Sequence, residues 1–274
     1  AQLSRGLGDV YKRQGGWRDH SESYLQTFYS DVRYRNDDTE LFLNIGQAFT
    51  DLRGNGAMPL SLADLEGRDA VYTYPDNTHN KNYYLNLGGN HFVNDTLSIQ
   101  GNMYYRHMER RNYNGDEFEG KDCGLSFDGS AGAADNTLCG EFEAAGAGNG
   151  VSFLTVGGNT INYANLGITL GDENEMENAG AINRSNTKTD AFGFNLQSLY
   201  DSQLLGKNNT FIGGINYDFS KNSFGSSTEL GVIQSDRGVI GTGVFVSTDE
   251  EGEEQFITNL ESTTHNFALY GSNT

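Results

Sequence analysis

The sequence predicts an all-β protein, an antiparallel segment of a transmembrane β-barrel with about seven strands and long loops. Apolar and polar residues alternate with period two over stretches of about ten or more residues, which is typical of strands that cross a bilayer. Short and long connections alternate strictly between these stretches. Glycine is abundant (36 residues) and proline is rare (2 residues), a composition that favours strands and open loops over packed helices.

The clearest alternation lies in residues 82–111, where two stretches flank the short polar turn 93–95. On the first stretch Tyr83, Leu85 and Leu87 share one parity, and polar residues take the other. A turn of a few residues that is rich in Asn and Asp joins antiparallel neighbours, so the pattern predicts a hairpin. We expect its apolar face to meet lipid and its polar face to line a lumen.

Two further hairpins and a final strand repeat this design. One hairpin covers residues 23–51 with its turn at 36–38, and another covers residues 192–219 with a longer turn at 201–208. The last strand is expected at residues 264–271. Together these units give about seven strands.

Long connections separate the hairpins, at residues 52–81, 112–186 and 220–263. Residues 59–66 predict a short helix with proline in its first turn, and residues 152–170 predict a small hairpin. In outer-membrane barrels the periplasmic turns are short and the extracellular loops are long. We therefore assign the three short turns to the periplasm and the long connections to the cell exterior.

Composition argues against several functions. The formal charge of −19 disfavours nucleic acid as a partner, because phosphates require Lys and Arg. A run of about eighteen apolar residues, which a transmembrane helix needs, does not occur, whereas barrel strands hide their apolar residues at alternate positions. The 5 histidines are scattered without metal-ligand spacing, and the residues form no catalytic set. We therefore expect neither an enzyme nor a metal site nor a cofactor.

Residues 4–14 (SRGLGDVYKRQ) resemble a translation of the transposase adapter that is used to prepare sequencing libraries. We therefore expect residues 1–14 to be adapter-derived and set them aside in predicting the fold. On this interpretation residues 15–274 are the protein proper, and the natural protein extends upstream of residue 15.

Four segments resemble TonB-dependent outer-membrane receptors: GWRDHS (16–21), LFLNIGQAFTDLRGNGAMP (41–59), AVYTYPDNTHN (70–80) and FALYGSNT (267–274). The resemblance implies a barrel of about 22 strands that holds an N-terminal plug, in the outer membrane of a Gram-negative bacterium. It also implies uptake of a scarce ligand, most often a ferric siderophore, driven by the TonB-ExbB-ExbD complex. Residues 15–274 would be part of that barrel, without the plug, the TonB box or the final strands.

The polar face of the 82–111 hairpin provides candidate ligand-binding residues. Tyr104, Arg106 and Arg110 share the lumen parity near the expected extracellular mouth. Arg donors and Tyr rings suit an anionic or catecholate-like ferric chelate, through charge-assisted hydrogen bonds and cation–π contacts. The alternative is that these arginines pair with other interior charges or with a plug. Arg33 and Arg35 flank a periplasmic turn, so contact with the plug or the periplasm suits them better.

The two cysteines, Cys123 and Cys139, lie in a Gly-rich polar connection. This position favours a loop disulfide in an oxidising compartment, with two free thiols as the alternative. Carboxylates cluster in the same long connections, where a solvated surface is the simpler interpretation and a weak calcium site the other.

Other functions stay open on the sequence. A passive porin-like channel would share the barrel but would lack a plug and a TonB box upstream. A secreted β-rich adhesin or surface module would be soluble without detergent. A soluble β-sandwich enzyme ranks last, because the residues offer no acid/base or nucleophile set.

Overall fold

The computed structural model describes residues 2–54, 56–118, 120–122, 137–144, 148–153, 155–156, 159–170, 176–246 and 258–274. Within these ranges the protein is all-β, as predicted, and is built on one nine-stranded sheet. Every pairing in this sheet is antiparallel, in the order β1-β2-β3-β4-β5-β11-β12-β13, and β14 also pairs with β12. The strands are β1 (Gln2–Gln14), β2 (Ser23–Arg35), β3 (Thr39–Arg53), β4 (Asp76–Asn94), β5 (Leu97–Glu117), β11 (Ala179–Leu204), β12 (Lys207–Ile233), β13 (Val239–Phe245) and β14 (Thr258–Asn273).

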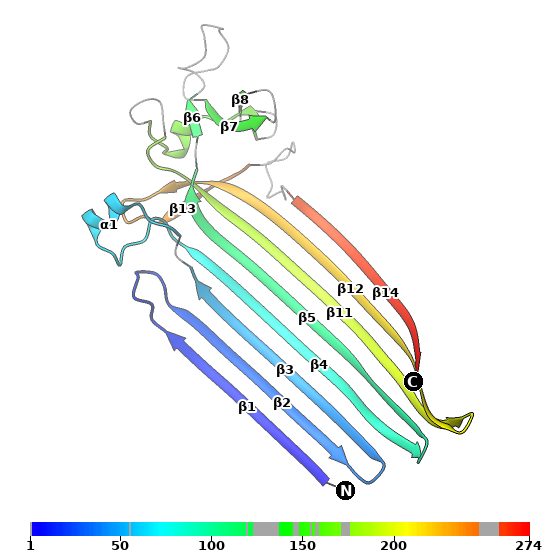
Figure 1. Ribbon diagram of the computed structural model, residues 1–274. Coiled ribbons are helices and arrows are strands. Elements are labelled where there is room, and N and C mark those ends of the chain that lie inside the picture. Colours follow the sequence, from blue (N-terminus) through cyan, green and yellow to red (C-terminus); the bar gives the residue numbers. More distant parts are fainter. Residues whose placement is uncertain are drawn as a thin grey trace.

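The long strands lie side by side, with the tight turns at one end of the sheet and the long connections at the other (Figure 1). We call these the short-turn end and the long-loop end. Both chain termini lie at the short-turn end. β5 and β11 pair over their whole shared length although a long connection separates them in the sequence. The arrangement therefore has the alternation of short turns and long loops that the sequence predicted.

Small elements occupy the long-loop end. A three-stranded sheet is formed by β6 (Gly120–Asp122), β7 (Leu138–Ala144) and β8 (Gly148–Phe153). The hairpin expected at 152–170 is shorter than predicted: β9 (Thr155–Val156) pairs with β10 (Asn159–Thr160), and a 3-10 helix follows. The predicted helix is confirmed as α1 (Leu60–Glu66), which starts after Pro59. Within the described residues, no helix combines the length and the hydrophobicity needed to cross a bilayer.

The sheet contains two strands that the alternation did not predict. β1 includes the adapter-like residues 4–14 and pairs along β2. An unpaired strand edge offers backbone donors and acceptors to any extended segment, so this pairing does not decide the origin of the segment. β13 falls within the connection expected at 220–263. It is short and contains two glycines, so it carries little alternation.

The register brings the apolar residues of neighbouring strands together on one face, which we call the aliphatic face. Leu85 pairs with Ile45 and Tyr105, and Tyr105 pairs with Phe192. Large side chains on this face are exposed, such as Met103 at 58%. An exposed apolar surface that runs across a whole sheet marks contact with a membrane or a partner. We call the opposite side, which carries the polar parity, the polar face.

The tight turns are stabilised by local side chains. Oδ1 of Asn36 accepts hydrogen bonds from the backbone N–H of Asp38 and Thr39 at 3.1 and 2.7 Å. The third turn is shorter than the expected 201–208, because only Leu205 and Gly206 separate β11 from β12. Both have positive φ, 54° and 77°, which is typical of a two-residue type I′ hairpin turn.

The buried core lies at the long-loop end. At that end, Val239 of β13 packs against the aliphatic face, in the space left by three glycines, Gly115, Gly180 and Gly231. A Cβ atom on any of these three glycines would lie 2.8 or 2.9 Å from a side-chain atom of Val239. The other main core cluster consists of Leu138, Ile161, Tyr163, Ile168, Met176, Ala179 and Leu230.

Candidate functional site

The predicted ligand-binding residues Tyr104, Arg106 and Arg110 lie on the polar face of β5. The register pairs Tyr104 with Asn86 and Arg106 with Tyr84 of β4. Each step from Tyr104 to Arg110 brings the side chain closer to the long-loop end. The three residues therefore form one stripe, which runs toward the loops.

Gly193 allows Tyr104 to reach across β11 to Asp218 on β12. The register places these three residues in one row. The Tyr104 hydroxyl donates a 2.6 Å hydrogen bond to Oδ1 of Asp218. A Cβ on Gly193 would lie 2.5 Å from that oxygen and 2.8 Å from Cε1 of Tyr104. The absence of a side chain at residue 193 is thus what makes room for the hydrogen bond, which fixes the orientation of the Tyr104 ring.

Arg106 and Arg110 both have exposed side chains on the same face. Nε of Arg110 donates a 3.3 Å hydrogen bond to Oδ1 of Asn112. For Arg106, no hydrogen bond or ion pair to another described residue is found. A guanidinium group with free donors can bind carboxylate, phenolate or phosphate oxygens in a bidentate manner. The stripe can therefore hold an anionic ligand beside the rings of Tyr84 and Tyr104.

Arg33 and Arg35 lie near the short-turn end. Nε of Arg33 is 3.0 Å from Oδ1 of Asp31, and its Nη1 is 3.7 Å from Oε1 of Glu40. Arg35 is opposite Glu40 in the β2–β3 ladder. The charge of Arg33 is therefore balanced within the sheet, and contact of either arginine with a plug or the periplasm stays a prediction.

A ladder of amide side chains crosses the polar face near these arginines. Asn44 donates to Oδ2 of Asp31 at 2.8 Å, Asn86 donates to Asn44 at 3.3 Å, and Asn102 donates to Asn86 at 3.1 Å. A groove of about 490 Å³ lies over the ladder. Because these amides bond to one another, the ladder links four strands side to side and stiffens this part of the sheet.

The predicted disulfide cannot be placed in the structure. Cys123 lies outside the described residues, as does the side chain of Cys139. The backbone of Cys139 pairs with Lys121 in the β6–β7 ladder. The pairing of the two cysteines therefore remains a prediction.

Sequence reasoning missed a cluster that joins three connections at the long-loop end. The Tyr74 backbone bridges to the turn between β12 and β13, with its N–H bonded to the carbonyl of Arg237 at 3.2 Å. The Tyr74 hydroxyl donates a 2.7 Å hydrogen bond to Asp236, and the His20 ring stacks on the Tyr74 ring at 3.7 Å. No local sequence signal could have identified this cluster, because its members come from connections far apart in the chain.

Hydrogen bonds in this cluster and at the neighbouring Tyr72 change the ionisation of the side chains involved. The bond from Tyr72 to Oε2 of Glu117, 2.5 Å long, raises the pKa of Tyr72 to about 12. The bond to Asp236 likewise raises the pKa of Tyr74. In return, the hydroxyl of Tyr74 lowers the pKa of Asp236, helped by the backbone N–H of Gly238. At neutral pH, Asp236 is therefore ionised and both tyrosines are neutral.

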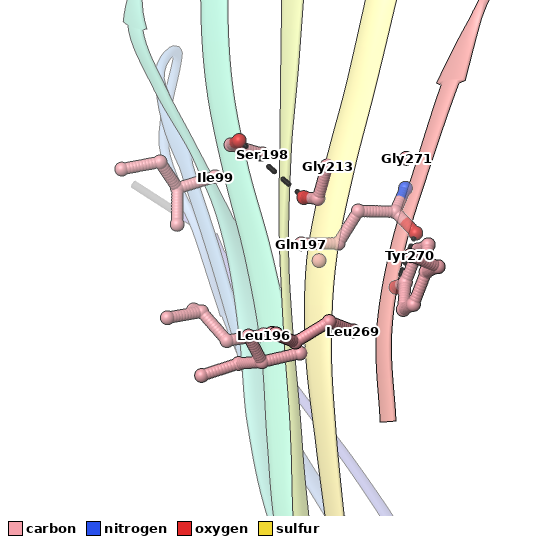
Figure 2. Close-up of a pocket in the computed structure, with 10 residues that line it drawn as sticks. Ile99, Leu196, Gln197, Ser198, Gly213, Leu269, Tyr270 and Gly271 are labelled. Carbon is pink, nitrogen blue, oxygen red and sulfur yellow. Dashed lines mark hydrogen bonds between the residues drawn. The ribbon is translucent and has the colours of Figure 1, made fainter. Parts of the chain in front are cut away.

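A hollow of about 610 Å³ lies beside β14 (Figure 2). Ile99, Leu196 and Leu269 contribute its apolar lining and belong to the aliphatic face. The hydroxyl of Tyr270 donates a 2.9 Å hydrogen bond to Oε1 of Gln197. The lining contains no charged side chain, so the hollow has little to orient a polar ligand.

No group of three or more His, Cys, Asp or Glu side chains in the described part of the chain is arranged to hold a metal ion. Of the sites above, the Tyr104–Arg110 stripe has the unpaired cation and the neighbouring rings that a ligand could use. It is therefore our candidate functional site.

Several solved structures share this fold, among them the following two. The ferric citrate transporter FecA in its unliganded form matches 99% of this chain and 30% of its own length, with 11% identity and a TM-score of 0.56. FpvAI, solved in complex with pyocin S2, matches 99% of this chain and 31% of its own length, with 12% identity and a TM-score of 0.54. The chain thus spans less than a third of either structure. No protein-family model and no curated protein matches the sequence.

Proposed function

We propose that this chain is part of the barrel wall of a TonB-dependent receptor in the outer membrane of a Gram-negative bacterium. The receptor takes up a scarce ligand, a ferric siderophore, with energy from the TonB-ExbB-ExbD complex. It is a transporter and not an enzyme. The observation that carries the proposal is an antiparallel sheet with one exposed aliphatic face and alternating short turns and long loops.

The length of the strands supports a membrane location. A tilted strand crosses the hydrocarbon core with about nine to eleven residues. β2 has 13 residues and β5 has 21, so each can cross the core and extend beyond it. The fold shared with a ferric citrate transporter agrees with this placement, as does the resemblance in residues 16–21, 41–59 and 70–80.

The ligand assignment rests on the stripe of Tyr104, Arg106 and Arg110. If the polar face lines a lumen, the stripe lies inside it and runs toward the outer mouth. Arg106 has donors that other described residues leave free, and ferric siderophores present anionic oxygens to such donors. The rings of Tyr84 and Tyr104 add surfaces for aromatic or cation contacts.

The test is ligand binding by the complete receptor in detergent. Combined Arg106→Ala and Arg110→Ala substitutions should weaken binding of a ferric catecholate chelate by about tenfold or more, the effect of losing one charge-assisted hydrogen bond. Lys221→Ala is the control, because it removes one positive charge from β12 on the side of the sheet opposite to the Tyr104–Arg110 stripe. Unchanged affinity in the double variant would remove the arginines from the ligand site.

Energy coupling needs a separate test on the natural gene. The upstream reading frame should encode a plug and a TonB box, and uptake of the chelate should stop in cells without TonB. Uptake that persists without TonB would support a passive porin-like channel. Recovery of the protein in the aqueous phase, without detergent, would support a secreted adhesin.

A further inference from the structure

Two exposed tyrosines lie on the polar face, in the same row of the ladder as Arg106. The register aligns Tyr29 of β2 with Gly46 of β3, Gly46 with Tyr84 of β4, and Tyr84 with Arg106 of β5. Tyr29 is 49% exposed and Tyr84 is 39% exposed. The two tyrosines therefore stand on either side of Gly46, beside the Tyr104–Arg110 stripe.

Gly46 leaves the space between the two rings unfilled. A Cβ at residue 46 would lie 3.7 Å from Cδ1 of Tyr84 and 4.0 Å from Cδ2 of Tyr29. Both rings therefore flank the position that a side chain would occupy. In the next row toward the long-loop end, β3 contributes Ala48, which is almost as small. Small residues on β3 thus separate larger side chains on β2 and β4.

The polar groups around this space have unused hydrogen-bonding capacity. The register places Thr27 and Asn82 on either side of Ala48. Among the described residues, no hydrogen-bond partner is found for their side chains or for the hydroxyls of Tyr29 and Tyr84. Hydroxyl and amide groups can both donate and accept. We call these six residues the two-tyrosine patch: Thr27, Tyr29, Gly46, Ala48, Asn82 and Tyr84.

The two-tyrosine patch is uncharged, although the chain has 37 acidic and 18 basic residues. In the adjacent row toward the short-turn end, Asp31 already bonds to Asn44 and pairs with Arg33. Arg106 borders the patch on β5, where it repels cations and attracts anions to its own guanidinium group. The patch itself therefore favours a neutral group that carries many hydroxyls.

A sugar ring has this chemistry. Its faces carry C–H groups, which pack against the negative face of an aromatic ring, and its edge carries hydroxyls that donate and accept. An aryl ring could also pack against the tyrosines, but it would leave the Asn82 amide and the Thr27 hydroxyl without partners. Polar groups that lose water without gaining a hydrogen bond weaken binding. The patch therefore fits a sugar ring better than an aryl ring.

We propose that the two-tyrosine patch binds a sugar ring of the transported ligand, which is therefore a glycosylated ferric chelate. This inference rests on the proposed function, which places the polar face in the lumen and the anionic chelate at Arg106. Neighbouring strands are about 4.8 Å apart, so Gly46 on β3 lies about 10 Å from Arg106 on β5. One ligand can therefore contact Arg106 with its anionic part while its sugar lies over Gly46.

The test compares three probes on the complete protein, in a detergent without a sugar headgroup. Calorimetry measures the binding of a ferric catecholate chelate, of the same chelate with glucosyl groups on its rings, and of maltotriose, a neutral sugar without iron. The glucosylated chelate should bind about tenfold more tightly than the plain one, the effect of one or two added hydrogen bonds. Maltotriose should bind more weakly than either chelate.

Variants assign this advantage to the two-tyrosine patch. Tyr29→Ala and Asn82→Leu should each reduce the advantage of the glucosylated chelate severalfold and weaken maltotriose binding, with the plain chelate unaffected. Tyr29→Phe keeps the ring and should retain most of the advantage. Tyr34→Ala is the matched control, because it removes an exposed ring from the opposite face of β2. Asn82→Leu keeps the test valid if Tyr29→Ala misfolds.

Equal binding of the two chelates by the wild type would overturn the sugar site and leave the proposed function intact. Tyr29→Ala that weakens both chelates equally would also overturn it, because the patch would then hold the aryl ring. Failure of both chelates to bind would contradict the proposed ligand. In that case, maltotriose binding that Asn82→Leu abolishes would still support the sugar site, and its absence would overturn the site as well.

Discussion

The Tyr74 hydroxyl bonds to Oδ2 of Asp236 at 2.7 Å, which ties the connection before β4 to the turn between β12 and β13. The backbone reinforces this tie, because the N–H of Val239 donates to the carbonyl of Tyr74 at 2.8 Å. The side-chain bond should also make the stability of this end depend on pH. The pKa of Asp236 is lowered in the fold, chiefly by Tyr74. The stabilisation that the ionised Asp236 contributes to the fold is therefore present above its unfolded pKa of about 3.9. It is lost as the pH falls through the lower folded pKa.

Tyr74→Phe should remove this contribution while keeping the ring that stacks on His20. We expect the complete protein to melt at a slightly lower temperature at pH 7, because one side-chain hydrogen bond is lost. The difference between the melting temperatures of wild type and variant should shrink as the pH falls below the unfolded pKa of about 3.9 and through the lower folded value. A difference of the same size at pH 7 and pH 2.5 would contradict the role of Asp236.

The Tyr72 hydroxyl should lose its proton at an unusually high pH. Its hydrogen bond to Glu117 raises its pKa to about 12, from the ordinary value of 10.0. Because the folded pKa is raised, the stabilisation is complete below pH 10 and is lost as the pH rises through about 12. The difference between the ultraviolet titrations of wild type and Tyr72→Phe isolates this one residue. A midpoint near 10 in that difference would contradict the hydrogen bond.

The turn between β11 and β12 offers a pair of opposite predictions. Gly206→Ala places a Cβ at φ 77° and should destabilise the hairpin by about 1 kcal/mol. Leu205→Asn replaces a leucine at φ 54° with a residue that tolerates this conformation, so it should raise the melting temperature. Thermal unfolding of the complete protein measures both effects. A shift in the same direction for both variants would contradict the type I′ turn.

Gly193 is predicted to act through the bond between Tyr104 and Asp218 and also to make room for the carbonyl oxygen of Tyr217, which would lie 2.8 Å from a Cβ there. Gly193→Ala and Tyr104→Phe should each lower stability, and the double variant should be no worse than the more severe single one. Gly271→Ala is the control, because a Cβ there meets its nearest atom at 3.8 Å. Additive losses in a double-mutant cycle would show that the glycine acts independently of the hydrogen bond.

Alternation of apolar and polar residues was sufficient to predict the hairpins and the order of short and long connections. It underestimated strand length, since β5 runs to Glu117 and β11 starts at Ala179. Beyond the apolar band both faces carry polar residues, so the periodic signal ends while the backbone ladder continues. The register between β5 and β11, which the long connection separates, could not be predicted from the alternation either. The alternation therefore placed Tyr104, Arg106 and Arg110 on one face, because a single strand carries all three, but it gave no sign of the Tyr74 cluster, which three connections assemble.

A membrane-crossing sheet requires that the aliphatic face meets lipid and that the polar face does not. Single cysteines at residues 84, 85, 86 and 87 of β4 can carry spin labels in a bilayer, in the complete protein with Cys123 and Cys139 replaced by serine. Labels at 85 and 87 should be accessible to oxygen dissolved in the membrane. Labels at 84 and 86 should be shielded from it and respond instead to an aqueous nickel complex. Equal aqueous accessibility at all four positions would contradict a membrane-crossing sheet.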